Sequence, residues 1–239
     1  MIKIMVEELY ASIRFVGSDV APDEISRLLD MRPSKSWRMG ELFVDVTGMV
    51  HRRYNGLWLY DLKGVKFNHP VEHMRCLMNL IKGRLVHLRD VQRGDFRIDL
   101  CLWIAAPEKS WSIDKQDMDL IVEEGFDGFN VTFVGMDDCS SKKQIVDNEV
   151  TARFLLYTGE SNHIEYSLET KGCAAECIEN CLSQFMQELQ SKSVGMVSPQ
   201  SNISIEWKVS HGALYMRREY LRLLHNMSYS KINFMFKTV

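Results

Sequence analysis

The stretch "SIDKQDMDLIVEEGFDGFNVTFV", residues 112–134, has a counterpart in "YMRREYLRLLHNMSYSKINFMFK", residues 215–237. The two segments align without a gap at a constant offset of 103 residues, and apolar residues coincide first at helical and then at strand spacing over 23 positions. The matches include Met118 with Leu221, Ile121 with Leu224 and Phe133 with Phe236. Such agreement at low identity predicts an internal repeat, each copy of which contains a helix followed by a strand.

Outside these two segments, the same kinds of element recur in both halves. Just upstream, "LCLWI" and "ISIEWKV" each predict a strand with one tryptophan, Trp103 and Trp207. Runs rich in β-branched and aromatic residues predict further strands, which gives 9–17, 56–62, 96–105, 129–135, 151–159, 163–170, 203–210 and 232–237. Apolar stripes, most of them flanked by capping signals, predict helices at 22–30, 69–83, 112–125, 174–189 and 215–227.

These elements predict an α+β protein of two tandem, divergent units, each a mostly antiparallel sheet with helices packed on one face. The first unit spans residues 1–136, and the second, shorter unit spans residues 150–239. The polar, aperiodic run at 137–149 predicts a linker between them. No equivalent of the 22–30 helix is evident in the second unit.

The composition is that of an ordinary globular protein, with 46% hydrophobic and 26% charged residues. A net charge of -3 gives no global field that favours nucleic acid or an anionic membrane, so we expect neither as a partner. The N-terminus lacks the pattern of a signal peptide, and no apolar run approaches the roughly 18 residues of a membrane span. We therefore expect a cytoplasmic protein whose six cysteines are reduced thiols.

A spread of small signals in the first unit follows one order along the chain: Asp19, Pro22, Glu24, Ile25, Leu28, Leu29, Pro33, Trp37, Gly40, Glu41, Gly56 and Trp58. With the helix around His73 and Leu77 and the segment 110–134, this order resembles a bacterial family known only as a domain of unknown function, DUF4279. The resemblance covers about residues 9–135 and implies a compact α+β domain without a known reaction. Family members often occur in bacterial genomes rich in toxin and immunity genes, which implies a neutralising role.

The most unusual cluster of the chain contains Trp37, Gly40, Glu41, Gly56 and Trp58. A tryptophan in a Pro/Ser/Gly-rich connection must find cover. We favour the structural interpretation, in which the two indoles cover the sheet and Gly40 allows a turn at positive φ. In the alternative, they wall a ligand-binding or partner-binding pocket that also uses Arg38, Glu41 and His73. The second unit lacks counterparts of Trp37, Gly40 and Glu41, so such a site belongs to the first unit alone.

Cysteines and histidines at four-residue spacing raise the question of a metal site. A continuous helix spreads Cys173, Cys177 and Cys181 over more than about 10 Å and places them beside its apolar face, which favours small core residues over a cluster. A zinc site of two of these thiols and a distant histidine stays an alternative. His69 and His73 have no third ligand nearby in the sequence. We predict no metal and no cofactor.

Opposite charges mark the two helices of the repeat. The segment 114–124 has a net charge of -4, whereas 216–227 has a net charge of +2. The candidate partner-binding residues here are Asp114, Asp117, Asp119, Arg217, Arg218 and Arg222. Such charges allow the two units to recognise each other or chains to self-associate head to tail, and two solvated helix faces explain them equally well. A basic RNA-binding face is a narrower alternative.

Contiguous catalytic signatures, such as a nucleophile elbow or a phosphate-binding loop, are absent from the sequence. We therefore predict a non-enzymatic protein-binding module, and more specifically an immunity-type protein that neutralises a bacterial toxin. The alternative is a small-ligand binder or enzyme that uses a pocket near Trp37, Glu41 and Trp58, because a catalytic site assembled in space leaves no contiguous trace. No residue is assigned a catalytic role.

Overall fold

The chain has an α+β fold, as predicted. A computed structural model describes residues 8–65, 67–91, 94–105, 108–134, 149–157, 163–171, 183–184, 187, 191, 202–208, 211–227 and 229–237. The cysteines at 173–181 and residues 137–148 of the predicted linker lie outside the described residues.

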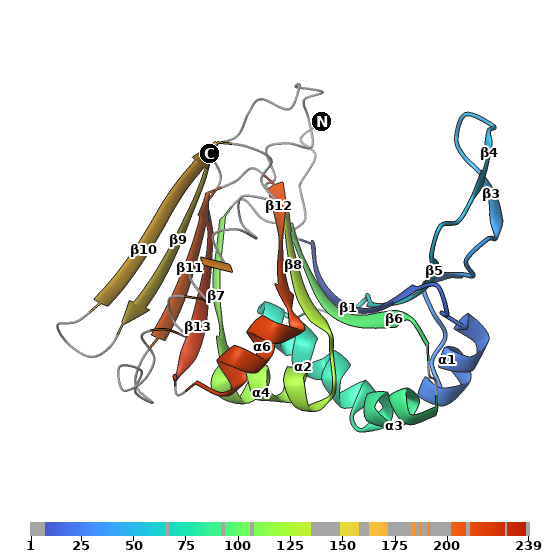
Figure 1. The fold of residues 1–239 in the computed structure, drawn as a ribbon, viewed down its shortest axis with the longest axis horizontal. Coiled ribbons are helices and arrows are strands. Elements are labelled where there is room, and N and C mark those ends of the chain that lie inside the picture. Colours follow the sequence, from blue (N-terminus) through green and yellow to red (C-terminus); the bar gives the residue numbers. More distant parts are fainter. Residues whose placement is uncertain are drawn as a thin grey trace.

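The first half of the chain builds most of a six-stranded sheet (Figure 1). Its spatial order is β12 (His211–Arg217), β8 (Gly128–Val134), β6 (Phe96–Ala105), β1 (Glu8–Gly17), β5 (Gly56–Leu62) and β2 (Lys35–Trp37). All neighbours are antiparallel except the parallel pair β6 and β8.

Strict alternation in β1 gives this sheet one apolar and one polar face. Ala11, Ile13 and Phe15 are fully buried on the face that carries the helices, because successive strand residues point to opposite faces. Ser12 and Arg14 therefore point to the other face. Figure 1 shows the helices gathered along one face of the sheet. They are α1 (Pro22–Leu29), α2 (Pro70–Ile81), α3 (Arg84–Val91), α4 (Lys115–Glu123) and α6 (Arg218–His225).

The helix termini follow the chemistry that the sequence indicates. Pro22 opens α1, and Asp30 ends it in the left-handed conformation with φ 52°. His69 caps α2 in a capping box with Glu72. Among the described helices, none combines the length and the apolar character that a membrane span requires.

A five-stranded sheet has the same topology as the first five strands of the larger sheet. Its order is β7 (Glu108–Asp114), β13 (Lys231–Lys237), β11 (Asn202–Lys208), β9 (Glu149–Tyr157) and β10 (His163–Lys171). The single parallel pair, β11 with β13, occupies the position of β6 with β8. The pairings also keep the 103-residue offset, because Gly128 pairs with Arg217 and Lys231 pairs with Asp114.

The two halves exchange edge strands. β7, from the first half, pairs with β13, whereas β12, from the second half, pairs with β8. Each predicted unit therefore completes the sheet of the other, and α4 contacts α6 between them. A common origin of the two halves and the unit boundaries at 136 and 150 stay predictions.

The exchange corrects two element assignments. Residues 112–114 and 215–217, predicted as starts of helical segments, are the last residues of β7 and β12. Asp114 does occupy the N-cap position of α4, but its side chain makes no capping hydrogen bond there. The capping residue thus marks the helix start correctly, whereas the sequence reasoning misses the strand directly before it.

Candidate functional site

A projecting arm lies between α1 and β5 and comprises residues 35–55 (Figure 1). It contains β2 and a separate two-stranded hairpin of β3 (Leu42–Val44) and β4 (Val50–Arg52). The register pairs Leu42 with Arg52, Phe43 with His51 and Val44 with Val50. Phe43 and His51 therefore share one face of the hairpin, and the other two pairs share the opposite face.

Asp45 organises the tip of the arm. Its Oδ1 accepts hydrogen bonds from the Thr47 backbone at 2.8 Å, the Thr47 hydroxyl at 2.6 Å and the Met49 backbone at 3.0 Å. Its Oδ2 lies 2.7 Å from His51 Nε2. The hydroxyl of Thr47, followed by His51, lowers the pKa of Asp45 to about 2. Gly48 completes the turn with φ +85°, where other residues are strained.

Hydrogen bonds join the two chain segments at the base of the arm. The Gly40 amide donates to the Arg53 carbonyl at 2.8 Å, and the Arg53 amide donates to the Glu41 carbonyl at 2.8 Å. Trp37 Nε1 donates to the Asn55 carbonyl at 3.1 Å. Gly40 has φ +83°. The arm is thus held by ordered contacts at its base and at its tip.

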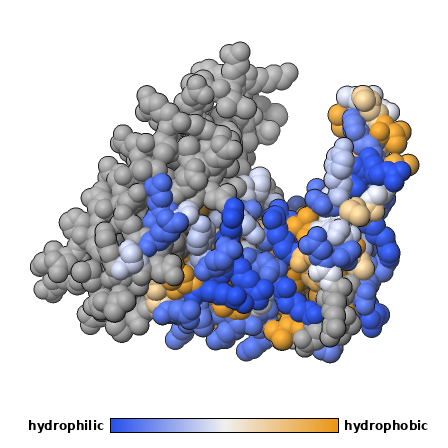
Figure 2. Space-filling view, in the orientation of Figure 1, coloured by the Kyte–Doolittle hydropathy of each residue, from blue (hydrophilic) through white to orange (hydrophobic). Residues whose placement is uncertain are grey.

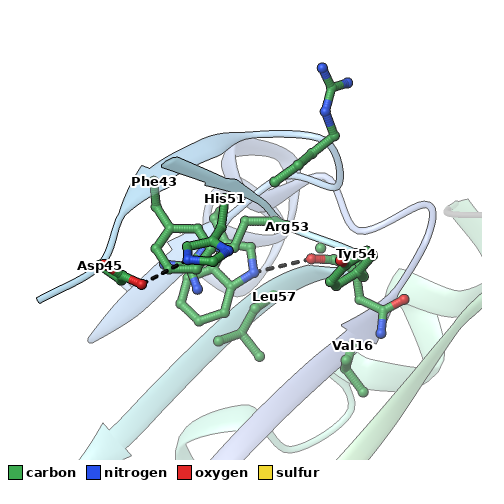
Figure 3. A pocket seen from close by; sticks show the side chains of 11 residues that line it. Val16, Phe43, Asp45, His51, Arg53, Tyr54 and Leu57 are labelled. Atoms are coloured by element: carbon green, nitrogen blue, oxygen red, sulfur yellow. Dashed lines mark hydrogen bonds and ion pairs between the residues drawn. The ribbon is translucent and has the colours of Figure 1, made fainter. Parts of the chain in front are cut away.

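A stack of flat groups runs along the inner face of the arm (Figure 3). The ring centroids of His51 and Phe43 are 5.4 Å apart. The Arg53 guanidinium carbon lies 3.6 Å from the Phe43 centroid and 4.0 Å from the Trp37 centroid. A guanidinium over an aromatic ring is attracted by the negative face of the ring, so the stack holds Arg53 in one orientation.

A pocket of about 470 Å³ opens between this stack and the edge of the sheet. It is lined by Val16, Trp37, Phe43, Asp45, His51, Arg52, Arg53, Tyr54, Asn55, Gly56 and Leu57. A smaller depression of about 300 Å³ adjoins it and shares Val16 and Asn55. Figure 3 shows Arg53, Tyr54 and Leu57 around the pocket.

The outer face of the arm is apolar and exposed. Val44 and Val50 are each 64% exposed and Leu42 is 59% exposed, and Val46 and Met49 are exposed at the tip. Figure 2 shows hydrophobic groups on the projecting arm beside strongly hydrophilic ones. The hydrophilic residues are mostly basic. Residues 32–56 contain five basic side chains, Arg32, Lys35, Arg38, Arg52 and Arg53, and two acidic ones, Glu41 and Asp45. With neutral histidines this segment has a net charge of +3, whereas the whole chain has a net charge of -3.

The structure brings together three of the five residues predicted around the pocket. Trp37 lines the pocket, and Arg38 and Glu41 lie in the turn beside it. Glu41 Oε2 accepts a hydrogen bond from the Arg38 amide at 3.1 Å, and Arg38 pairs with Asp23 at 2.6 Å on the surface. These two side chains therefore shape the turn, and neither lines the pocket.

Trp58 and His73 lie elsewhere. Trp58 is fully buried under the sheet, where its Nε1 donates to Ser26 Oγ at 2.9 Å. Because neighbouring residues of a strand point to opposite faces, Leu57 reaches the pocket and Trp58 cannot. His73 is 1% exposed on α2, and burial lowers its pKa. Its Nδ1 has no hydrogen-bond partner among the described residues.

Several of the predicted charged residues on α4 and α6 form ion pairs within the chain. Arg75 binds Asp117 bidentately, at 2.8 and 2.7 Å, and lies 3.4 Å from Asp114. Two further contacts link α4 to α6, and a third links α6 to the loop between α4 and β8. His225 Nδ1 lies 2.9 Å from Asp119 Oδ1, Lys115 Nζ donates to the His225 carbonyl at 2.7 Å, and Arg218 pairs with Asp127 at 3.1 Å. Arg217 is the last residue of β12, and Arg222 lies on α6. A partner-binding role of this surface stays a prediction.

A second polar cluster lies on the face of the sheet opposite the helices. Asp99 is fully buried, and its carboxylate accepts hydrogen bonds from Arg14 at 2.7 Å, Arg97 at 3.1 Å and the Tyr215 hydroxyl at 3.0 Å. Burial, reinforced by Asp99, raises the pKa of Tyr215. Burial also raises the pKa of the neighbouring Cys101 to about 12, so this thiol is not a reactive nucleophile.

Apart from Trp37 and Gly56, sequence reasoning misses the residues that line the pocket. Phe43, His51 and Arg53 meet only because the hairpin folds back on itself. A signal for that hairpin exists, since "DVTG" at 45–48 places an Asx-turn former and a glycine between two short apolar runs.

Comparisons with curated proteins and with solved structures find no match. The family model described as domain of unknown function, DUF4279, matches residues 7–127, which is half of the chain and includes α1, the arm, the pocket and α4. This chain therefore belongs to the DUF4279 family.

Proposed function

We propose that this chain is a protein-binding module whose binding element is the arm. The observation that carries the proposal is the exposed apolar outer face of the hairpin, which includes Leu42, Val44 and Val50. Contiguous exposed apolar groups rimmed by polar ones are characteristic of sites that bind another protein. Because the base and the tip of the arm are both fixed by hydrogen bonds, little conformational entropy is lost when a partner binds.

The positive charge of the arm favours a partner with an acidic surface. With a net charge of +3, residues 32–56, which include the arm, are attracted to an acidic surface. The favoured partner is therefore a protein whose acidic surface surrounds an apolar centre. A toxin neutralised by this chain is the specific form of this proposal.

Partner binding is tested in two steps with the full chain. First, the chain is used to capture proteins from its native host, and the captured protein is identified by mass spectrometry and purified. Second, its affinity is measured by calorimetric titration against the unaltered chain and against Val44→Asp. We expect Val44→Asp to weaken binding by about tenfold to a hundredfold, because it places a charge in the apolar centre of the interface.

Val86→Asp is the matched control, because Val86 is a partly exposed valine, 46% accessible, on α3 away from the arm. It should bind the partner with unchanged affinity. Equal affinities of the Val44→Asp variant and the unaltered chain would rule out the arm as the binding element.

The pocket supports a second candidate, a small-ligand binder. Its volume of about 470 Å³ falls in the range of about 300–1,000 Å³ that ligand sites occupy. Native mass spectrometry of the chain purified from its host separates the two candidates. A small molecule that the unaltered chain retains and Trp37→Ala loses would favour the second candidate, whereas a retained protein partner favours the first.

A further inference from the structure

Arg53 is a cation without an acidic partner among the residues that the structure describes. Its side chain lies against the rings of Phe43 and Trp37, and its backbone makes two hydrogen bonds. The acidic residues of the arm are engaged elsewhere, since Asp45 binds the tip and His51, and Glu41 binds the amide of Arg38. Within the described residues, the N–H donors of the Arg53 guanidinium are therefore open to a ligand.

The position of Arg53 is fixed before any ligand arrives. The rings of Phe43 and Trp37 lie against its guanidinium at 3.6 and 4.0 Å. The Trp37 ring is itself held by the Asn55 carbonyl, and the Phe43 ring by His51 and thus by Asp45. A long side chain normally loses rotamer entropy when it binds, and this stack removes most of that loss in advance.

The edge of the Arg53 guanidinium that the rings leave open favours a carboxylate as its ligand. When rings lie against its faces, a guanidinium presents its planar edge, and the two parallel N–H bonds of that edge match a carboxylate. Single-stranded nucleic acid fits less well, because Arg53 already covers one face of each ring and leaves less aromatic surface for stacking on bases. The apolar side chains Val16 and Leu57 in the pocket wall suit a polypeptide with apolar neighbours.

We propose that Arg53 binds a side-chain carboxylate of the partner, an aspartate or glutamate flanked by apolar residues, in the arm pocket. This inference rests on the proposed function, since it names the group of the partner that enters the pocket.

The test uses nuclear magnetic resonance of the full, nitrogen-15-labelled chain. The probe is the capped peptide acetyl-Leu-Asp-Val-Asp-Leu-amide, which has side-chain carboxylates and no free terminus. Its control is the same peptide with asparagine in place of aspartate. We expect the aspartate peptide to shift the Nε–H signal of Arg53 and the indole signal of Trp37 saturably. The asparagine peptide should bind about tenfold more weakly or worse, because it lacks the charge-assisted hydrogen bonds.

Variants and inorganic phosphate complete the design. Arg53→Lys should weaken the aspartate peptide about tenfold, because an ammonium cannot form the bidentate contact, whereas Arg27→Lys on α1 should leave its affinity unchanged. Two outcomes overturn the proposal even with the unaltered chain: equal shifts by the two peptides, or the same Arg53 shift by phosphate at the same concentration and ionic strength. If Arg53 does not bind the aspartate peptide but Val44→Asp still weakens binding of the purified partner, the arm remains the binding element and only the role of Arg53 is wrong.

Discussion

At the scale of single residues, Asp99 shows how much a buried charge depends on its neighbours. It is fully buried and holds Arg14 and Arg97, and it also binds Tyr215 from the second half of the chain. We expect Asp99→Asn to lower the free energy of unfolding by about 2 to 4 kcal/mol, because it leaves two cations without their counter-charge. Urea denaturation measures this. Asp23→Asn, which breaks the exposed pair with Arg38, should change stability by less than about 0.5 kcal/mol.

The burial of His73 predicts that the free energy of unfolding depends on pH. Burial lowers its pKa below the ordinary value, although the Phe67 carbonyl and Glu72 favour the charged form. The unfolded chain therefore takes up a proton below about pH 6.5 that the folded chain resists, so stability falls as pH falls from there towards the folded pKa. The slope from this one group is at most about 1.4 kcal/mol per pH unit.

The measurement compares urea midpoints at about pH 5.5 and about pH 7.5. His73→Gln should lose less stability at the lower pH than the unaltered chain does. The exposed His87→Gln should keep the full loss. An identical loss in His73→Gln and in the unaltered chain would contradict a buried, neutral histidine.

At the scale of elements, the arm depends on its turn. Gly48 has φ +85°, and a methyl group added at its Cα would meet nothing within 4 Å, so the cost of Gly48→Ala comes from the backbone alone. We expect a local destabilisation of about 1 kcal/mol, seen as roughly fivefold faster hydrogen exchange of the hairpin amides with no change in the sheets. Val46→Ala, at the fully exposed tip, is the control and should leave exchange unchanged. Unchanged exchange in Gly48→Ala would show that the hairpin does not need this turn.

Most elements could be predicted from the sequence because their signals are local. The strand at 56–62 and the helix that starts at Pro22 follow from β-branched and aromatic residues in the one case and from an N-terminal proline in the other. β7 escapes such prediction although Trp111 and Ile113 alternate with polar residues, because Ser112 and Asp114 also signal a helix start. Where a strand leads directly into a helix, the same residues carry the strand alternation and the helix-start signal, and the strand is missed.

At the scale of the whole molecule, the exchange of β7 and β12 makes each half depend on the other. Fragment 1–136 lacks β12, which supplies the buried Leu214 and Met216, and fragment 150–239 lacks β7, which supplies Trp111 and Ile113. We expect neither fragment to fold alone to a monomer and a mixture of the two to recover the native circular dichroism spectrum. Size-exclusion chromatography and circular dichroism measure this. A folded, monomeric 1–136 fragment would contradict the mutual dependence.

The sequence by itself determined the α+β class, most helices and strands, the 103-residue offset that the strand pairing follows, and the family resemblance. All of these come from short-range periodicity, capping residues and ordered small motifs. Only the tertiary structure decided which half each edge strand joins, since equivalent strands have similar local patterns and either pairing satisfies them. It also placed Trp37 at the pocket and Trp58 in the core, and brought Arg53 between Phe43 and Trp37. These contacts depend on where the chain turns back and on which face of its strand each side chain lies. Both bring together residues that are distant along the sequence.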